Sequence, residues 1–241
     1  MFGTETSQIT VEYRSQDAAR LLTGLVVLEV FLATSHIFLF VWPGVSLETA
    51  RAILGLDGET TLGTWFSTIQ LFSIGAVLLL TSWANEREDR FPHDVFILIG
   101  LLFVYLSADE GGAIHERIEA YVKGSGLDSL LLTGNAGGWI SIYAFMGLTF
   151  LFLLLYLTGN SLFRIWKLFT LECLFFICGF LVILIGGFGF ETLFYIYLDS
   201  GTKMYHLETA IEEFLEMTGA SITLYATLEI AATLCSEEFA Q

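Results

Sequence analysis

Long apolar runs constrain this chain more than any other feature of its sequence. The stretch from Gly137 to Leu157 holds 21 residues without a charged side chain, and several other runs approach that length. A helix of about 20 apolar residues spans the hydrocarbon core of a bilayer. Apolar residues make up 55% of the chain, more than soluble domains usually carry. The sequence therefore predicts an all-α, polytopic integral membrane protein with about six transmembrane helices in one bundle.

Short polar turns separate the six predicted helices. The helices cover approximately residues 19–41, 63–84, 94–122, 137–157, 163–185 and 205–235. A short amphipathic helix, SLETARAILGL, is expected between the first two, and GGFGFETLFYIYLD is expected to extend the fifth helix or to form an interfacial segment. The predicted organisation is a polar N-terminal segment at 1–18, a six-helix transmembrane domain at 19–235 and a short acidic tail at 236–241.

The N-terminal segment, MFGTETSQITVEYRSQDAAR, lacks the basic start and short apolar core of a signal peptide. Insertion is therefore expected to use the first transmembrane helix. The N-terminal segment and the turns after the second and fourth helices hold six Lys or Arg residues, and the opposite loops hold four. Because basic residues in short loops favour the cytoplasmic side, the protein is predicted to be integral to the cell membrane with both termini in the cytoplasm.

The net charge of −16, from 26 acidic and 10 basic residues, argues against nucleic acid as a partner. The acid excess fits adaptation to high salt, and it fits equally an acidic surface kept soluble by its charge. The three cysteines form no CxxC pair and are expected to be core or lipid-facing residues.

Acidic and histidine residues gather where the predicted helices end. The first, third and fifth helices end on one side of the membrane, and the sixth begins there, so their polar ends are predicted to share one leaflet. By the charge rule this leaflet lies near the extracytoplasmic face. The residues concerned are His36, Asp109, Glu110, His115, Glu116, Glu191, His206, Glu208, Glu212, Glu213 and Glu216.

Carboxylates crowded at a membrane boundary need bound cations, shared protons or water to coexist. The third helix has only about 14 apolar residues before Asp109, so we expect this acidic stretch to lie at or within the boundary. Carboxylates with imidazole favour a divalent metal ion, with Fe, Mn or Zn preferred over Mg or Ca. The predicted metal ligands are Asp109, His115, Glu116, Glu212, Glu216 and His36.

A metal at this position would activate water or oxygen on a lipid or other small apolar substrate that enters from the membrane. Glu213 is then the candidate general base, because it lies one step round the helix from two predicted ligands. The pattern is compatible with a hydrolase and with an oxidoreductase. The sequence contains no GxSxG, HExxH, Walker A or dinucleotide-binding motif.

Three other interpretations stay open. In the first, the protein is a proton- or cation-coupled transporter, and Glu29, Glu172 and Glu229, which lie within apolar runs, continue a path towards the other face. In the second, the acidic helix ends are simply solvated and favour the helix dipole. In the third, the chain is a non-catalytic subunit of a membrane complex or a homo-oligomer. The expected partners are membrane lipids and a small apolar substrate or a cation.

Overall fold

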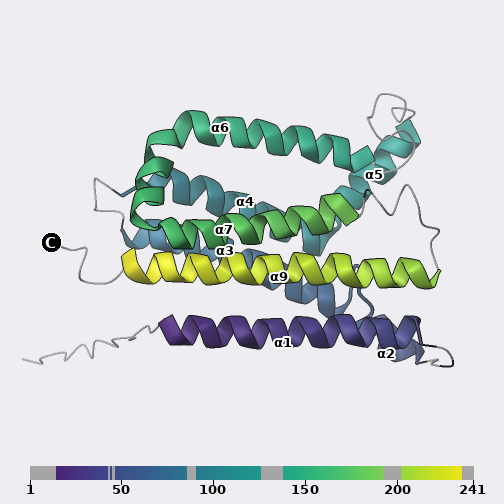
Figure 1. Cartoon of the computed structure of the whole chain (residues 1–241). Coiled ribbons are helices and arrows are strands. Elements are labelled where there is room, and N and C mark those ends of the chain that lie inside the picture. The colour runs from purple at the N-terminus through teal and green to yellow at the C-terminus, as the bar shows by residue number, and fades with distance from the viewer. Residues whose placement is uncertain are drawn as a thin grey trace, which may run out of the picture.

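A computed structural model describes residues 15–42, 44, 47–85, 91–125, 138–190, 192 and 202–234. Within these ranges every regular element is a helix and there is no strand. The elements lie side by side along the long direction of the molecule (Figure 1). They are α1 (Ser15–Phe40), α2 (Glu48–Leu54), α3 (Leu62–Ala84), α4 (His93–Gly112), α5 (Ile114–Ser125), α6 (Gly138–Leu168), α7 (Thr170–Leu184), the π-helix η2 (Ile185–Phe190) and α9 (Lys203–Leu234).

Five helices in the described ranges are long and apolar enough to cross a membrane: α1, α3, α4, α6, and α7 together with η2. This confirms the predicted all-α membrane bundle. The sixth predicted helix, α9, has 32 residues, which span about 48 Å. It runs beside α1 for most of the bundle (Figure 1), but it is not among the five because its acidic and hydroxyl residues lower its hydropathy.

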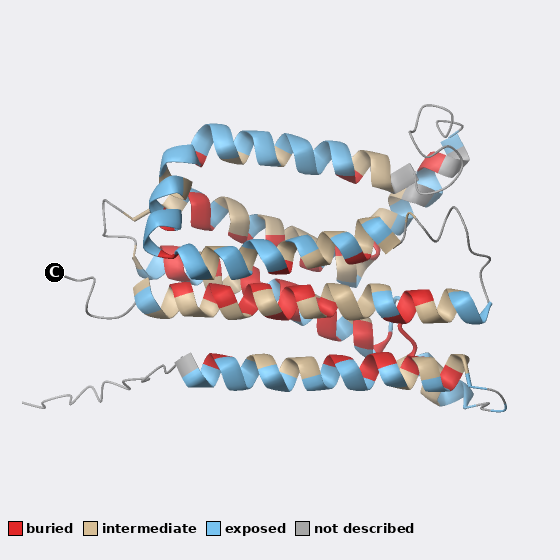
Figure 2. Ribbon diagram, in the orientation of Figure 1, coloured by how far each residue is buried: buried red, intermediate tan, exposed pale blue. Residues whose placement is uncertain are grey.

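The helix α9 lies at the centre of the packing, because it contacts α1, α3 and α7, and α3 also packs against α4. By contrast, α6 exposes most of its surface (Figure 2), including the side chains of Phe145, Phe152 and Tyr156. Apolar side chains on an outer helix are what a lipid-facing wall requires. The buried polar residues therefore concentrate on the inner helices, and the large exposed aromatic residues face outward.

Pairs of glycines allow the inner helices to approach closely. A Cβ atom added to Gly179 of α7 would lie 2.7 Å from the backbone oxygen of Gly219 in α9, and one added to Gly219 would lie 2.6 Å from that of Gly179. Gly75 of α3 and Gly100 of α4 oppose each other in the same way, at 2.8 and 3.2 Å. Small residues at helix crossings are the usual basis of close packing in membranes, where lipid removes most of the hydrophobic driving force.

The third predicted helix, residues 94–122, is two helices in the structure. The first, α4, ends at Gly112, and Ala113 adopts a left-handed conformation with φ 49°. This conformation terminates helices. The Asp109 carboxylate then accepts a hydrogen bond from the backbone N–H of His115 at 2.9 Å, which satisfies a backbone donor in the first turn of α5. The residues expected to continue one helix therefore start a new one.

The predicted amphipathic helix between the first two spans is present as α2. Arg51 attaches it to the end of α1, because Nε and Nη2 donate to the Leu39 carbonyl at 2.9 and 2.7 Å. The guanidinium also lies over the Phe40 ring at 5.0 Å. A cation at a helix C-terminus satisfies carbonyls that lack a partner within the helix. This contact fixes where the chain turns towards α3.

The boundary between the fourth and fifth predicted helices lies further along the chain than the sequence indicated. The helix α6 continues through the expected turn at 158–162 and ends at Leu168, and α7 begins at Thr170. Thr158 in this stretch is buried, and its hydroxyl is satisfied within the helix by the Leu154 carbonyl. The predicted extension of the fifth helix takes the form of η2.

We predict that Gly179→Ala lowers the stability of the bundle by about 1–3 kcal/mol, the usual cost of overpacking. The added methyl group meets backbone atoms of α9, which cannot move aside as the end of a flexible side chain can. Gly147→Ala is the matched control, because nothing lies within 4 Å of the added Cβ on α6. Thermal unfolding in detergent measures the difference, and equal melting temperatures for the two variants would contradict the close crossing of α7 and α9.

Candidate functional site

One end of the bundle collects most of the polar residues that the sequence singled out. The C-terminal ends of α1 and α4, the helix α5, the π-helix η2 and the start of α9 all lie at this end (Figure 1). The structure thus confirms that these helix ends lie together. Glu191 lies outside the described residues. The remaining groups form separate clusters with different partners.

The first cluster contains His36 of α1, which is fully buried. Its Nδ1 accepts a hydrogen bond from the backbone N–H of Leu56 at 2.9 Å. The His206 ring lies 5.5 Å away between centroids, and His206 Nδ1 is 3.9 Å from Asp57 Oδ2. Among the described residues, His36 Nε2 has no hydrogen-bond partner of good geometry, although the His206 backbone is close. The two imidazoles and one carboxylate can therefore exchange protons or bind a polar ligand.

The second cluster is centred on the buried carboxylate of Asp109. Oδ1 accepts from the Tyr143 hydroxyl at 2.8 Å, and the Tyr105 and Tyr143 hydroxyls lie 2.9 Å apart. Oδ2 lies 3.3 Å from His115 Nδ1. A carboxylate at Nδ1 orients an imidazole and leaves Nε2 to act as a base or a metal ligand. Asp109 therefore orients the His115 ring in this cluster.

The third cluster is a pair of carboxyl groups that joins the α2–α3 loop to α5. Glu59 and Glu116 share a side-chain hydrogen bond, and Glu110 and His115 lie near enough to act electrostatically on Glu59. The pKa of Glu59 is raised from 4.5 to about 7, first because the surrounding chain removes water from the carboxyl group and then because of Glu116. Two such groups coexist most readily when they share a proton.

The acidic stripe of α9 faces a different neighbour. Glu208 is buried and shares a side-chain hydrogen bond with Glu212. Glu216 lies against η2, because Cβ atoms added to Gly186 and Gly187 would come within 2.7 Å of its side chain. The glycines of this π-helix thus let a carboxylate approach the backbone, and π-helices are frequent at functional sites. Glu213, the predicted general base, is half-buried on the same helix.

The fourth cluster lies in the middle of the bundle, around Glu29 of α1. Glu29 is fully buried. Its Oε1 accepts from Ser221 Oγ at 2.5 Å and from Gln70 Nε2 at 3.1 Å, and its Oε2 accepts from Thr218 Oγ1 at 2.9 Å. Gln70 Nε2 also approaches the Met217 carbonyl at 3.3 Å. Among the described residues, the hydrogen bonds to this carboxylate come from neutral groups of α3 and α9.

The other two residues of the predicted proton path lie towards the opposite end of the bundle. Glu172 lies in the first turn of α7 and Glu229 lies near the C-terminus of α9, and both are half-buried. Since α7 and α9 run antiparallel (Figure 1), these two positions share one end. Titratable groups thus occur at both ends of the bundle and in its centre.

The structure divides the predicted metal ligands between these clusters. Asp109 and His115 are together, Glu116 pairs with Glu59, and His36 pairs with His206. Glu212 and Glu216 follow the face of α9 that meets η2. In the part of the chain that the structure describes, no group of three or more His, Cys, Asp or Glu residues has the arrangement to hold a metal ion. A metal site built from all six residues stays a prediction.

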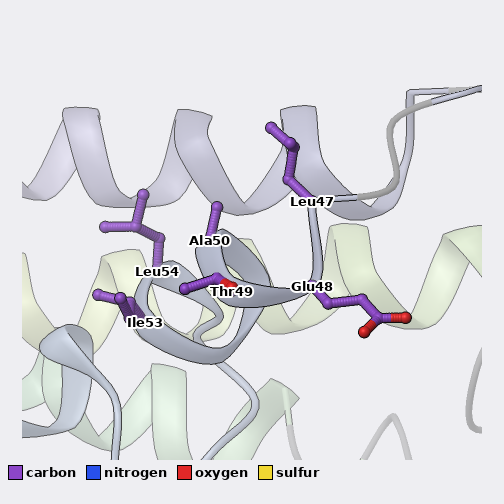
Figure 3. Close-up of a pocket in the computed structure, with 6 residues that line it drawn as sticks. All are labelled: Leu47, Glu48, Thr49, Ala50, Ile53 and Leu54. Carbon is purple, nitrogen blue, oxygen red and sulfur yellow. The ribbon is translucent and has the colours of Figure 1, made fainter.

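An open hollow lies on the surface of α2 (Figure 3). Its lining residues are Leu47, Glu48, Thr49, Ala50, Ile53 and Leu54. The helix has no buried residue, and Leu47 and Ile53 are exposed. The hollow contains none of the predicted site residues, and its apolar side chains are typical of a helix that rests at a membrane interface.

Several residues of these clusters escaped the sequence analysis. Asp57 and Glu59 belong to LDGET, a loop that follows the first helix and therefore lies at the same end as the other polar groups. Because successive helices alternate in direction, the sequence could have placed Asp57 and Glu59 at this end. Tyr143 and Ser221 gave none, because a single hydroxyl in an apolar run is common in membrane helices and its partner depends on how the helices pack.

Raising the pH should loosen the contact between the α2–α3 loop and α5. Between about pH 4.5 and 7, the folded chain keeps a proton on Glu59 that the unfolded chain releases, so this contribution to stability is full below about pH 4.5, declines across this range and is lost above about pH 7. Hydrogen exchange of α5 amides, corrected for intrinsic rates, should therefore accelerate across this range.

Glu59→Gln imitates the protonated group and should remove the pH dependence of exchange in α5. Glu48→Gln, at an exposed position on α2, is the matched control and should leave it unchanged. If Glu59→Gln retained the wild-type pH dependence, the shared proton would not hold the loop to α5.

Comparison with known proteins identifies the family. No curated protein and no solved structure matches the chain. Residues 21–231 match the family described as a domain of unknown function, DUF8692. The matched range includes every cluster described above, together with all of α3 and most of α1 and α9, the helices around Glu29. The protein belongs to the DUF8692 family.

Proposed function

We propose that this protein is a proton- or cation-coupled membrane transporter in which Glu29 binds the ion. The main observation that supports this proposal is that Glu29 is buried halfway along α1. The salt bridges found among the described residues do not include Glu29. A buried carboxylate without a cationic partner is costly, and neutral residues alone could have joined the same helices.

The hydrogen bonds around Glu29 suit a group that changes its charge. Ser221, Gln70 and Thr218 donate hydrogen bonds to the carboxylate. A hydroxyl donor can rotate and accept when the carboxyl group carries a proton. The site can therefore hold a proton or release it without rearrangement of the helices.

Apolar layers on both sides of Glu29 favour a carrier over an open pore. Leu32, Phe66 and Met217 pack together towards the end with the histidines. Ile74 and Leu224 belong to the larger core in the other direction. An ion at Glu29 is enclosed by these layers, so its release requires one layer to open, as in alternating access.

The polar groups at the two ends supply entry and exit positions. His36, His206 and Asp57 lie beyond one apolar layer, and Glu172 and Glu229 lie beyond the other. Carboxylates and imidazoles inside membrane bundles commonly form proton relays. The sequence had suggested Glu29, Glu172 and Glu229 as one path, and this proposal adds the histidine cluster as its second opening.

We expect purified protein in liposomes to dissipate an imposed proton gradient, reported by a pH-sensitive dye inside the vesicles. Glu29→Gln keeps most of the hydrogen bonds but cannot exchange a proton, so its flux should fall to that of protein-free liposomes. Glu48→Gln on the exposed surface of α2 is the control and should retain wild-type flux. Undiminished flux through folded Glu29→Gln would contradict the proposal.

The second candidate function is a metal-dependent membrane enzyme, favoured by the Asp109–His115 contact. Asp109 orients His115, and Glu59 and Glu116 add carboxylates nearby. This donor set suits Fe, Mn or Zn, which would activate water or oxygen on a lipid or other apolar substrate. Glu212, Glu216 and the predicted base Glu213 would then contribute from α9.

Metal analysis by inductively coupled plasma mass spectrometry tests the second candidate. If His115 with its neighbours holds the metal, His115→Ala should lose it and Glu212→Ala should retain it. If α5 and α9 share one centre, both variants should lose it. Wild-type protein without stoichiometric metal, after purification without chelators and with the metals supplied, would contradict this function.

A further inference from the structure

The surroundings of Glu29 contain more oxygen atoms than a single proton needs. Glu29 Oε1, the Ser221 hydroxyl and the Met217 carbonyl lie around the Gln70 amide nitrogen, and the Thr218 hydroxyl bonds to the other Glu29 oxygen, Oε2. These five oxygens and the Gln70 amide form a cage. These atoms come from α1, α3 and α9, and they lie between the two apolar layers. A proton on Glu29 needs only the oxygen that carries it and one hydrogen-bond acceptor.

The hydrogen-bonding groups around the Gln70 amide do not match the needs of its nitrogen and its oxygen. Its nitrogen lies 3.1 Å from Glu29 Oε1, 2.7 Å from Ser221 Oγ and 3.3 Å from the Met217 carbonyl. An amide nitrogen has two hydrogens for these three oxygens. Its Oε1 is buried without a hydrogen-bond partner in the described part of the chain, and the residue is 2% exposed. A buried acceptor without a partner is costly.

We propose that this cage binds a small monovalent cation of the sodium class, in exchange with a proton on Glu29. The amide nitrogen, with its partial positive charge, lies among oxygens as a cation would. Rotation of the amide turns Oε1 of Gln70 into the cage, which then presents only oxygens to the ion and gives Oε1 its partner. This inference rests on the proposed transport function and names the ion coupled to it.

Charge and ligand type select the class of ion. One carboxylate neutralises one monovalent cation, whereas a divalent ion would leave an uncompensated charge in an apolar interior. The cage has no imidazole or thiolate, the ligands that favour transition metals. Ser221 and Thr218 lie only 2.5 and 2.9 Å from Glu29 oxygens, so the cage is small and suits sodium better than potassium.

The test measures binding of radioactive sodium to purified protein and the melting temperature in sodium or potassium. We expect saturable sodium binding, displaced by acid and not by potassium, and a higher melting temperature in sodium. Ser221→Ala and Thr218→Val remove one oxygen each and should weaken binding at least about tenfold. Thr227→Val is the control, because this buried hydroxyl bonds to the Thr223 carbonyl of its own helix and not to the cage.

The outcomes separate this inference from the proposed function. Proton flux that depends on Glu29, without sodium binding or with binding unchanged in Ser221→Ala and Thr218→Val, would overturn the sodium site and leave proton transport standing. Sodium binding lost in those variants, without any flux, would support the site and contradict transport. Loss of binding in Thr227→Val as well would overturn the assignment to this cage.

Discussion

The hydrogen bonds between Glu29 and two neighbouring helices are the interaction on which the rest of the bundle depends. Lipid offers no partner to a buried polar group, so these groups must satisfy one another. Gln70 of α3 and Ser221 of α9 bond to the same carboxylate oxygen. This contact fixes how far the three helices can slide past each other, and the polar groups at each end take their positions from that register.

The register brings the loop after α2 across the polar end of the bundle. Leu56 binds His36, and Asp57 faces His206. Two residues later, Glu59 reaches Glu116 of α5. One loop therefore contacts the histidine cluster and the cluster around Asp109 and His115, so a change of protonation in either cluster acts on the same short segment. This loop connects one end of the proposed ion path to the acidic groups of α4 and α5.

The sequence predicted the class of fold because lipid imposes simple rules on length and composition. It also predicted which helix ends meet, because helices that alternate in direction return their ends to the same side. The break at Ala113 escaped prediction because an alanine with positive φ leaves no mark in a sequence; the side chain that caps it, Asp109, was instead interpreted as a metal ligand. Contacts between facing helices depend on rotation about each axis, which the sequence does not reveal, so Glu29 was noted without its partner Gln70.

The central claim is that Glu29 exchanges its proton inside the bundle, and infrared difference spectroscopy tests it most directly. Spectra of the protein at low and high pH should contain a carboxyl band that disappears in Glu29→Gln and persists in Glu172→Gln. That result would show that a buried group located between α1, α3 and α9 changes its charge. A difference spectrum unaffected by Glu29→Gln would contradict the account and leave Glu29 as a fixed link between helices.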